Sequence, residues 1–297
     1  MNPKRYRGEE FHFSNLGPLL AMTTRFIGFV RSSPLIAIPS LVLSLILITA
    51  LLAEVVSTHS PLEQDVPQRL SSPGANHYFG TDGFGRDVFS RVIYGTRGAL
   101  YIGLLAVTLA GIFGIWLGTL SAYYRGAFDL VFQRVVDVLL GFPLLVLALV
   151  MVLAIGSSTN SVAIAIALAI APQVSRLSRA IALSTIAEPY LDAARALGAS
   201  PTRIIWKYLL PSSFPTILAQ LTGYLGTAIV AETTLSYLGL GVPPPEPSWG
   251  RMLQEGSRQY FEVAPWVTIF PGIALSLTVL NCALLGDAIR DLYSPRT

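Results

Sequence analysis

The sequence predicts an all-α integral membrane protein with six transmembrane helices. Hydrophobic residues make up 53% of the 297 and charged residues only 12%, with a mean hydropathy of +0.60, whereas a soluble domain has about 25% charged residues. About 20 apolar residues form a helix that crosses a hydrocarbon core about 30 Å thick, and backbone facing lipid must be helical. Six apolar runs have roughly this length: 35–56, 99–123, 138–155, 162–181, 217–240 and 263–285.

The chain is expected to begin with a cytoplasmic leader, residues 1–34. The apolar run that follows, 35–56, is longer than the apolar part of a signal peptide and lacks a cleavage motif of small residues, so we predict that it is retained as the first span. With the N-terminus inside, 14 of the 20 Lys and Arg residues fall on the cytoplasmic side. The excess predicts a multi-pass protein with both termini in the cytoplasm.

The first outer loop, 57–96, contains the segment RDVFSRVIY, in which Phe89, Val92 and Ile93 share one helical face. This pattern predicts an amphipathic helix lying along the outer membrane surface. Just before it, FGTDGFGRD contains glycines suited to tight turns and acids that can cap a helix. A structural role explains this segment, and contact with a partner protein is the alternative. Its candidate residues are Gly80, Thr81, Asp82, Gly85, Arg86 and Asp87.

A charged segment, 188–211, interrupts the apolar sequence between the fourth and fifth spans. Gly198 can end a first helix, and Ser200 followed by a proline can begin a second one that ends at Pro211. Ala193 and Ala194 are expected to share a face with Leu197, where small side chains let another surface approach closely. A plain connecting loop with solvated charges is the alternative.

The amino-acid sequence of this segment resembles a known motif. DAARALG, followed at the expected distance by an apolar residue and Leu-Pro, resembles the EAA loop of permease subunits in ABC importers, with Asp192 in place of the usual glutamate. In that family the loop forms a coupling helix that docks on an ATP-binding subunit. The resemblance implies these coupling positions: Asp192, Ala193, Ala194, Gly198, Leu210 and Pro211.

Two further segments narrow the resemblance. FGTDGFGRDVFSRVIYG (79–95) and AETTLSYLGLGVPPPEPSWGRML (231–253) resemble segments of the dipeptide, oligopeptide and nickel permease family, and the leader and short tail resemble its C-type subunit. The resemblance implies a type I permease fold, with a permease core at 97–290 that holds spans two to six. It also implies a bacterial or archaeal cytoplasmic membrane. The implied partners are a second homologous permease, two ATP-binding subunits that bind ATP and Mg, an extracytoplasmic solute-binding protein, and membrane lipid.

The sequence argues against chemistry in this chain itself. A P-loop needs Gly-Lys-Ser/Thr, but the two lysines, Lys4 and Lys207, follow no glycine, so we expect no enzyme activity and no cofactor in this chain. His12, His59 and His77 have no metal-ligand spacing and are expected to be unrelated. Basic residues form no block, so a nucleic-acid partner is not expected.

One acid, Glu232, lies inside a predicted span toward its outer end. Ionisable residues within spans often serve function, so Glu232 is a candidate for lining the substrate pathway. A structural hydrogen bond to a neighbouring helix is the alternative.

Together these features predict a permease subunit of an ATP-driven importer for di- or oligopeptides or a related small solute. Nickel chelates and glutathione remain possible substrates. A secondary transporter or a channel is the alternative from a different class, although the inverted repeats typical of many secondary transporters are not evident.

Overall fold

A computed structural model describes residues 34–293, and the regular secondary structure of this part of the chain consists of helices, without a β-strand. Its single isolated bridge joins Thr81 and Asp87. The all-α prediction is therefore confirmed. The elements, with short 3-10 or π turns labelled η, are α2 (Pro34–Leu51), α3 (Ala53–Val56), η1 (Val66–Gln68), α4 (Val88–Tyr124), α5 (Gly126–Leu140), α6 (Leu144–Ile155), α7 (Thr159–Ile186), α8 (Pro189–Ala196), α9 (Pro201–Ile204), η2 (Ile205–Leu209), α10 (Leu210–Tyr237), α11 (Trp249–Glu255), η3 (Gly256–Tyr260) and α12 (Trp266–Tyr293).

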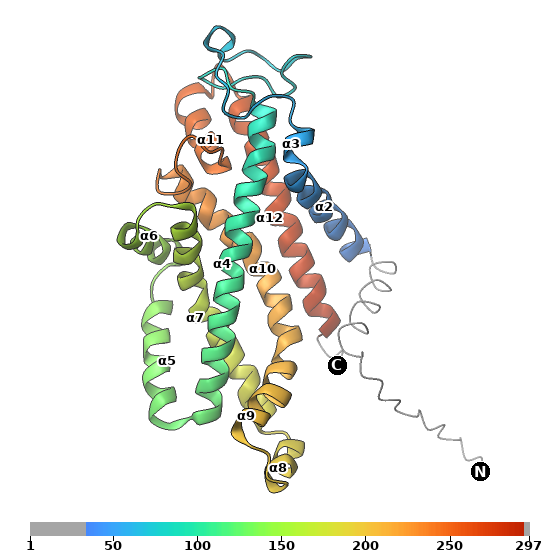
Figure 1. Cartoon of the computed structure of the whole chain (residues 1–297), viewed down its shortest axis with the longest axis vertical. Helices are drawn as coiled ribbons and strands as arrows, with labels where there is room; N and C mark the ends of the chain where they lie inside the picture. The colour runs from blue at the N-terminus through green and yellow to red at the C-terminus, as the bar shows by residue number, and fades with distance from the viewer. Residues whose placement is uncertain (1–33, 294–297) are drawn as a thin grey trace, which may run out of the picture.

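The long helices form an elongated bundle with irregular segments at its two ends (Figure 1). The loop between α3 and α4 lies with α11 at one end, and α8 with α9 lies at the other. Helices α4 and α7 pack together most extensively, α10 contacts both, and α12 lies between α10 and α2. Residues 1–33 and 294–297, which include most of the predicted leader, lie outside the described part.

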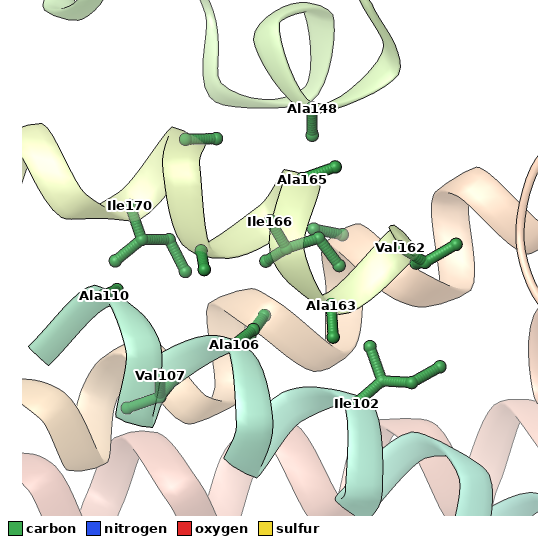
Figure 2. Packing of buried hydrophobic residues seen from close by; sticks show 14 of the residues in the cluster. Ile102, Ala106, Val107, Ala110, Ala148, Val162, Ala163, Ala165, Ile166 and Ile170 are labelled. Carbon is green, nitrogen blue, oxygen red and sulfur yellow. The ribbon is translucent and has the colours of Figure 1, made fainter. Parts of the chain in front are cut away.

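Small residues allow α4 and α7 to approach closely. Ala106 on α4 and Ala163 on α7 are fully buried in one apolar cluster, into which Ala148 of α6 also projects (Figure 2). Lower on the same interface, a Cβ added to Gly118 would overlap the carbonyl oxygen of Ser175. Without a hydrophobic driving force in lipid, such close packing is what holds transmembrane helices together.

Four of the predicted spans correspond to helices long and apolar enough to cross a membrane: α4, α7, the helix 201–237 and α12. The predicted span 138–155 is not one straight helix, because α5 and α6 meet at 99°. Pro143 explains the break, since proline has no N–H to donate and disfavours helical backbone at the residue before it. If this pair is one span there are five and not the predicted six, because the apolar helix α2 is shorter than the helices that qualify as spans.

The second span begins earlier than predicted. The segment RDVFSRVIY is not a separate surface helix, because helix α4 runs without interruption from Val88 to Tyr124. Val92 and Ile93 are buried, and Val92 packs with Met252 of α11. The apolar face was recognised from the sequence, but it packs against α11 of this chain and does not form a separate surface helix.

The helix that follows Ser200 also differs from the prediction. It does not end at Pro211, since α9, η2 and α10 form one continuous helix from Pro201 to Tyr237. In the π turn, the N–H of Leu210 donates to the carbonyl of Ile205, five residues earlier. This wider turn carries the helix past Pro211, which has no N–H to donate.

Candidate functional site

Helix α8 is a short helix at the end of the bundle opposite α11 (Figure 1). It begins at Pro189 and stops because Gly198 takes φ +79°, a conformation that favours glycine. The N–H of Gly198 donates to Arg195 and that of Ala199 donates to Ala194, at 2.9 and 3.0 Å. These two bonds form a Schellman motif that ends the helix sharply.

The next helix begins with the cap that the sequence predicts. The hydroxyl of Ser200 accepts from the N–H of Arg203 at 3.3 Å, and Pro201 occupies the first helical position. The predicted arrangement of helix, glycine turn and helix is confirmed. Only one residue, Ala199, separates the Gly198 turn from this cap, so α8 is tied closely to the helix that becomes α10.

The two alanines of the motif do not share a face, which corrects the prediction. Ala194 lies beside Leu191 on the buried face of α8, and Leu191 packs in the apolar cluster that contains Ile204. Ala193 is exposed, and Leu197 is 89% exposed. Successive helical residues are rotated by about 100°, so the neighbouring alanines point in different directions.

The remaining motif residues lie around the same tip. Asp192 is exposed and accepts from Arg195 at 2.9 Å within the helix. Gly198 has open space where a Cβ would be. Leu210 is partly buried against the apolar cluster beneath α8, and Pro211 is exposed. The six predicted positions therefore comprise an exposed outer surface and a buried support.

The sequence reasoning left two exposed apolar residues out of the motif set. Leu197 is the most exposed large hydrophobic residue in the described chain, and Trp206, on the following helix, is 57% exposed. Trp206 also packs edge-on against Trp116 of α4. Leu197 stands directly before Gly198, where α8 ends and the chain turns. This position in the sequence indicates that its side chain points away from the bundle.

At the opposite end, Asp82 organises a buried charge cluster. One carboxylate oxygen accepts from the backbone N–H groups of Phe84 and Arg86, and the other accepts from the Arg86 guanidinium at 2.7 Å. Arg86 also contacts Glu255 at 3.1 Å, and the buried Arg91 lies 3.5 Å from Asp82. Buried charges are costly unless they are paired, so the cluster has a structural role: it joins the loop before α4 to α4 and α11.

The turns around Asp82 have specific backbone requirements. Gly80 and Gly85 adopt φ of +73° and +75°, and a Cβ on Gly85 would overlap the carbonyl of Asp65. The hydroxyl of Thr81 donates to the carbonyl of Gln68 at 2.5 Å. The predicted turns are thus confirmed, and these residues contact other parts of this chain.

Asp87 begins α4 by accepting from the N–H of Ser90 at 2.8 Å. Its other oxygen lies 2.9 Å from Nδ1 of His77 and 3.9 Å from Nδ1 of His59. The expectation that these two histidines are unrelated is therefore wrong, since the fold brings them together although 18 positions separate them. His12 lies outside the described residues.

Helix α11 is locked onto the same end of the bundle. The indole N–H of Trp249 donates to the carbonyl of Val92 at 3.0 Å, and the guanidinium of Arg251 donates to the carbonyl of Val242. Burial lowers the pKa of Arg251 from its ordinary value. The segment between α10 and α12 is thus an ordered cap on this end of the bundle.

Glu232 is 1% exposed and lies on the α10 face covered by α11. One oxygen accepts from the hydroxyls of Ser236 and Ser248, at 2.7 and 3.2 Å, and the other lies 3.4 Å from the hydroxyl of Thr233. In the described conformation Glu232 lines no open surface. These contacts favour the structural alternative, a link between α10 and the cap.

Residues 110–297 match the model of a protein family described as binding-protein-dependent transport system inner membrane component. The chain belongs to this family. The match covers the whole described region from mid-α4 onward, including α8 and its Schellman turn. The chain is therefore a multi-pass permease subunit of an ABC importer, which works with an ATPase and other transporter components and is not itself an enzyme.

Several relatives are similar over most of their length. A protein of Brucella suis named as a peptide transport system permease is 41% identical over 254 residues, which cover 86% of this chain and 85% of the relative. The dipeptide transport system permease protein DppC of Alkalihalophilus pseudofirmus is 38% identical, with 90% and 88% covered. The glutathione transport system permease protein GsiD of Pectobacterium atrosepticum is 36% identical, with 78% and 77% covered.

The fold is similar to that of solved importer subunits. A chain of the MetNI methionine ABC transporter, in inward-facing conformations, has a TM-score of 0.57 at 19% identity, with 69% of this chain and 97% of that chain covered. A chain of an amino acid ABC transporter has a TM-score of 0.52 at 20% identity. The fold is that of a type I ABC importer permease, which confirms the prediction.

Proposed function

We propose that this chain forms one half of the translocation path for peptides or a related small solute, together with a second, homologous permease subunit. Two ATP-binding subunits would lie beneath α8 and hold ATP and Mg²⁺. A solute-binding protein would deliver the substrate to the opposite end. The names of the relatives support the peptide substrate, and the family description itself refers to a binding protein.

The observation that carries the coupling proposal is the tip of α8. Leu197, 89% exposed at the end of α8, presents an apolar side chain that would be stabilised if a groove of another protein covered it. Beside it, Ala193 offers a small surface that a groove can approach. The tip is supported from below by Leu191 and Ala194, so a force on α8 acts on the bundle and does not merely bend a loop.

The helix from Pro201 to Tyr237 can transmit a movement of α8 to the opposite end of the bundle. It begins next to α8 and ends beside α11, where Glu232 and Ser248 are hydrogen-bonded. We infer that ATP-driven closure of the partner subunits shifts α8 and favours one of two arrangements of the bundle, which is alternating access. Both termini would lie in the cytoplasm, on the α8 side, as the distribution of Lys and Arg indicates.

The coupling proposal is tested by placing arginine at neighbouring positions in the assembled transporter. Ala193→Arg adds bulk to the exposed face, so the protein should insert and assemble while substrate uptake falls at least tenfold and ATP hydrolysis no longer depends on substrate. Ala194→Arg buries a charge and should instead reduce the amount of folded protein. Uptake and ATPase activity in proteoliposomes, with size-exclusion chromatography, separate these effects.

Glu63→Arg serves as the control, because Glu63 is exposed at the opposite end of the bundle. It should leave coupling unchanged. Normal uptake with both Ala193→Arg and Leu197→Ala would refute the proposed docking surface.

Glutathione is a second candidate substrate, favoured by the 36% identity to a glutathione transport permease. A thermal-shift screen of the cognate binding protein against dipeptides, longer peptides, glutathione and nickel chelates distinguishes the candidates. The ligand that raises its melting temperature should also stimulate ATP hydrolysis by the complete transporter. Family membership in the ABC importers excludes the secondary-transporter and channel alternatives.

A further inference from the structure

Three potential metal ligands meet at the outer end of α4. His59 follows α3, His77 lies in the irregular loop, and Asp87 is the N-cap of α4. One ligand atom from each lies within 4.8 Å of the other two. The three residues lie in the segment between α3 and α4, and the fold of this loop brings them together.

The distances are close to those of a metal site. Asp87 Oδ1 lies 2.9 Å from Nδ1 of His77 and 3.9 Å from Nδ1 of His59. With metal–ligand distances of about 2.0–2.1 Å, two ligands of a tetrahedral ion lie roughly 3.3 Å apart. Shifts of about an ångström at the exposed His59 would bring the three atoms to that spacing.

The two carboxylate oxygens of Asp87 make different contacts. Oδ2 accepts from the N–H of Ser90 at 2.8 Å and lies 3.4 Å from the hydroxyl of Thr58, while Oδ1 faces the imidazoles. The backbone N–H of His59 donates to Ser90 Oγ at 3.1 Å. Hydrogen bonds of this kind hold metal-binding side chains in position and increase the affinity for the metal.

The two imidazoles differ in exposure. The side chain of His77 is 11% exposed and that of His59 is 39% exposed, with ring centres 4.6 Å apart. His59 therefore leaves a route for an ion from the outer solution, and water can occupy a remaining coordination position. Two imidazoles and one carboxylate suit a divalent ion of borderline softness.

We propose that His59, His77 and Asp87 bind a divalent transition metal, for which Zn²⁺ is the matched probe. The ion would replace the direct contact between His77 Nδ1 and Asp87 Oδ1. It would link the chain after α3 to the first turn of α4, and so fasten the outer loop to the bundle independently of the substrate that the transporter carries.

The test uses the full chain in detergent, purified with a tag that lacks histidine and treated with chelator. Isothermal titration with Zn²⁺ should show one site per chain. His59→Phe keeps an aromatic ring at the exposed position but removes the ligand, and should weaken binding at least tenfold. His77→Phe and Asp87→Asn should do the same, and asparagine preserves the helix cap.

Glu63→Gln and Asp65→Asn are the controls, because each removes a potential ligand outside the three-residue cluster. Both should bind Zn²⁺ as the parent does. Zn²⁺ should raise the melting temperature of the parent and of the controls, but not that of His59→Phe, since a ligand that binds only the folded state stabilises it. X-ray absorption at the Zn edge should show two imidazole ligands.

Two results would overturn the proposal. One is the absence of stoichiometric Zn²⁺ binding by the parent chain, which would leave the cluster as a hydrogen bond between His77 and Asp87. The other is equal binding by the parent, His59→Phe and His77→Phe, which would place the ion elsewhere. Because His59 is exposed, its variant keeps the test valid if His77→Phe fails to fold.

Discussion

The two ends of the bundle use polar residues in opposite ways. At the α11 end Asp82, Arg86 and Arg91 are buried and contact one another or nearby backbone groups. At the α8 end the charges are exposed, as in the pair formed by Asp192 and Arg195, and the large apolar Leu197 faces outward. The buried charges at the α11 end are paired within this chain, whereas the α8 tip presents exposed charges and an exposed leucine that another protein can contact.

This difference distinguishes a sequence motif that stabilises the fold of this chain from one that is suited to contact a partner protein. The polar side chains of FGTDGFGRD form hydrogen bonds and ion pairs with other residues of this chain. The fold of a single chain therefore explains their pattern. The exposed half of DAARALG has no such explanation within the described residues. Mutations should therefore impair stability at the α11 end and coupling at the α8 end.

The largest expected effect is at Asp82. Asp82→Ala leaves the buried guanidiniums of Arg86 and Arg91 without this carboxylate, and breaking a buried ion pair costs about 3–5 kcal/mol. The variant should show a much lower melting temperature or a strongly reduced yield of folded protein. Glu246→Ala, an exposed acid in the last outer loop, should behave as the parent. An unchanged melting temperature for Asp82→Ala would remove the distinction between the two ends.

An intermediate effect is expected at the helix interface between the ends. Gly118→Ala places a methyl group against the Ser175 carbonyl, and overpacking of this kind costs about 1–3 kcal/mol. Gly223→Ala is the matched control, because it has open space and a helical backbone. It should be neutral or stabilising by about 0.5–1 kcal/mol. Equal thermal stability of the two variants would contradict the close packing of α4 and α7.

The smallest effect on stability is expected at Asp192. Asp192→Asn removes an exposed ion pair of a kind that contributes about 0.2–1 kcal/mol. Its melting temperature should remain close to that of the parent. Comparing substrate-dependent ATP hydrolysis in Asp192→Asn and Asp192→Glu then shows whether docking needs the charge. A loss of stability as large as that of Asp82→Ala would show that α8 is part of the folding core.

Local signals predicted local structure well. Ser200, Pro201 and Gly198 each act within a few residues, through a cap, a fixed φ or a positive φ, and the structure places them as expected. The course of the helices around Pro143 and Pro211 was less predictable. Both prolines can interrupt a helix, but only one does, because a π turn bridges Pro211 while α5 and α6 separate at Pro143.

From the sequence alone, hydropathy determined an all-helical membrane chain, and the resemblance of three motifs indicated its family. Those properties depend on composition and on neighbours along the chain. Only the tertiary structure decided that Ala194 is buried while Ala193 is exposed, that the start of α4 packs under α11, and that His59 and His77 meet at Asp87. Each of these depends on which distant segment lies opposite a residue, and that is set by the packing of the whole bundle.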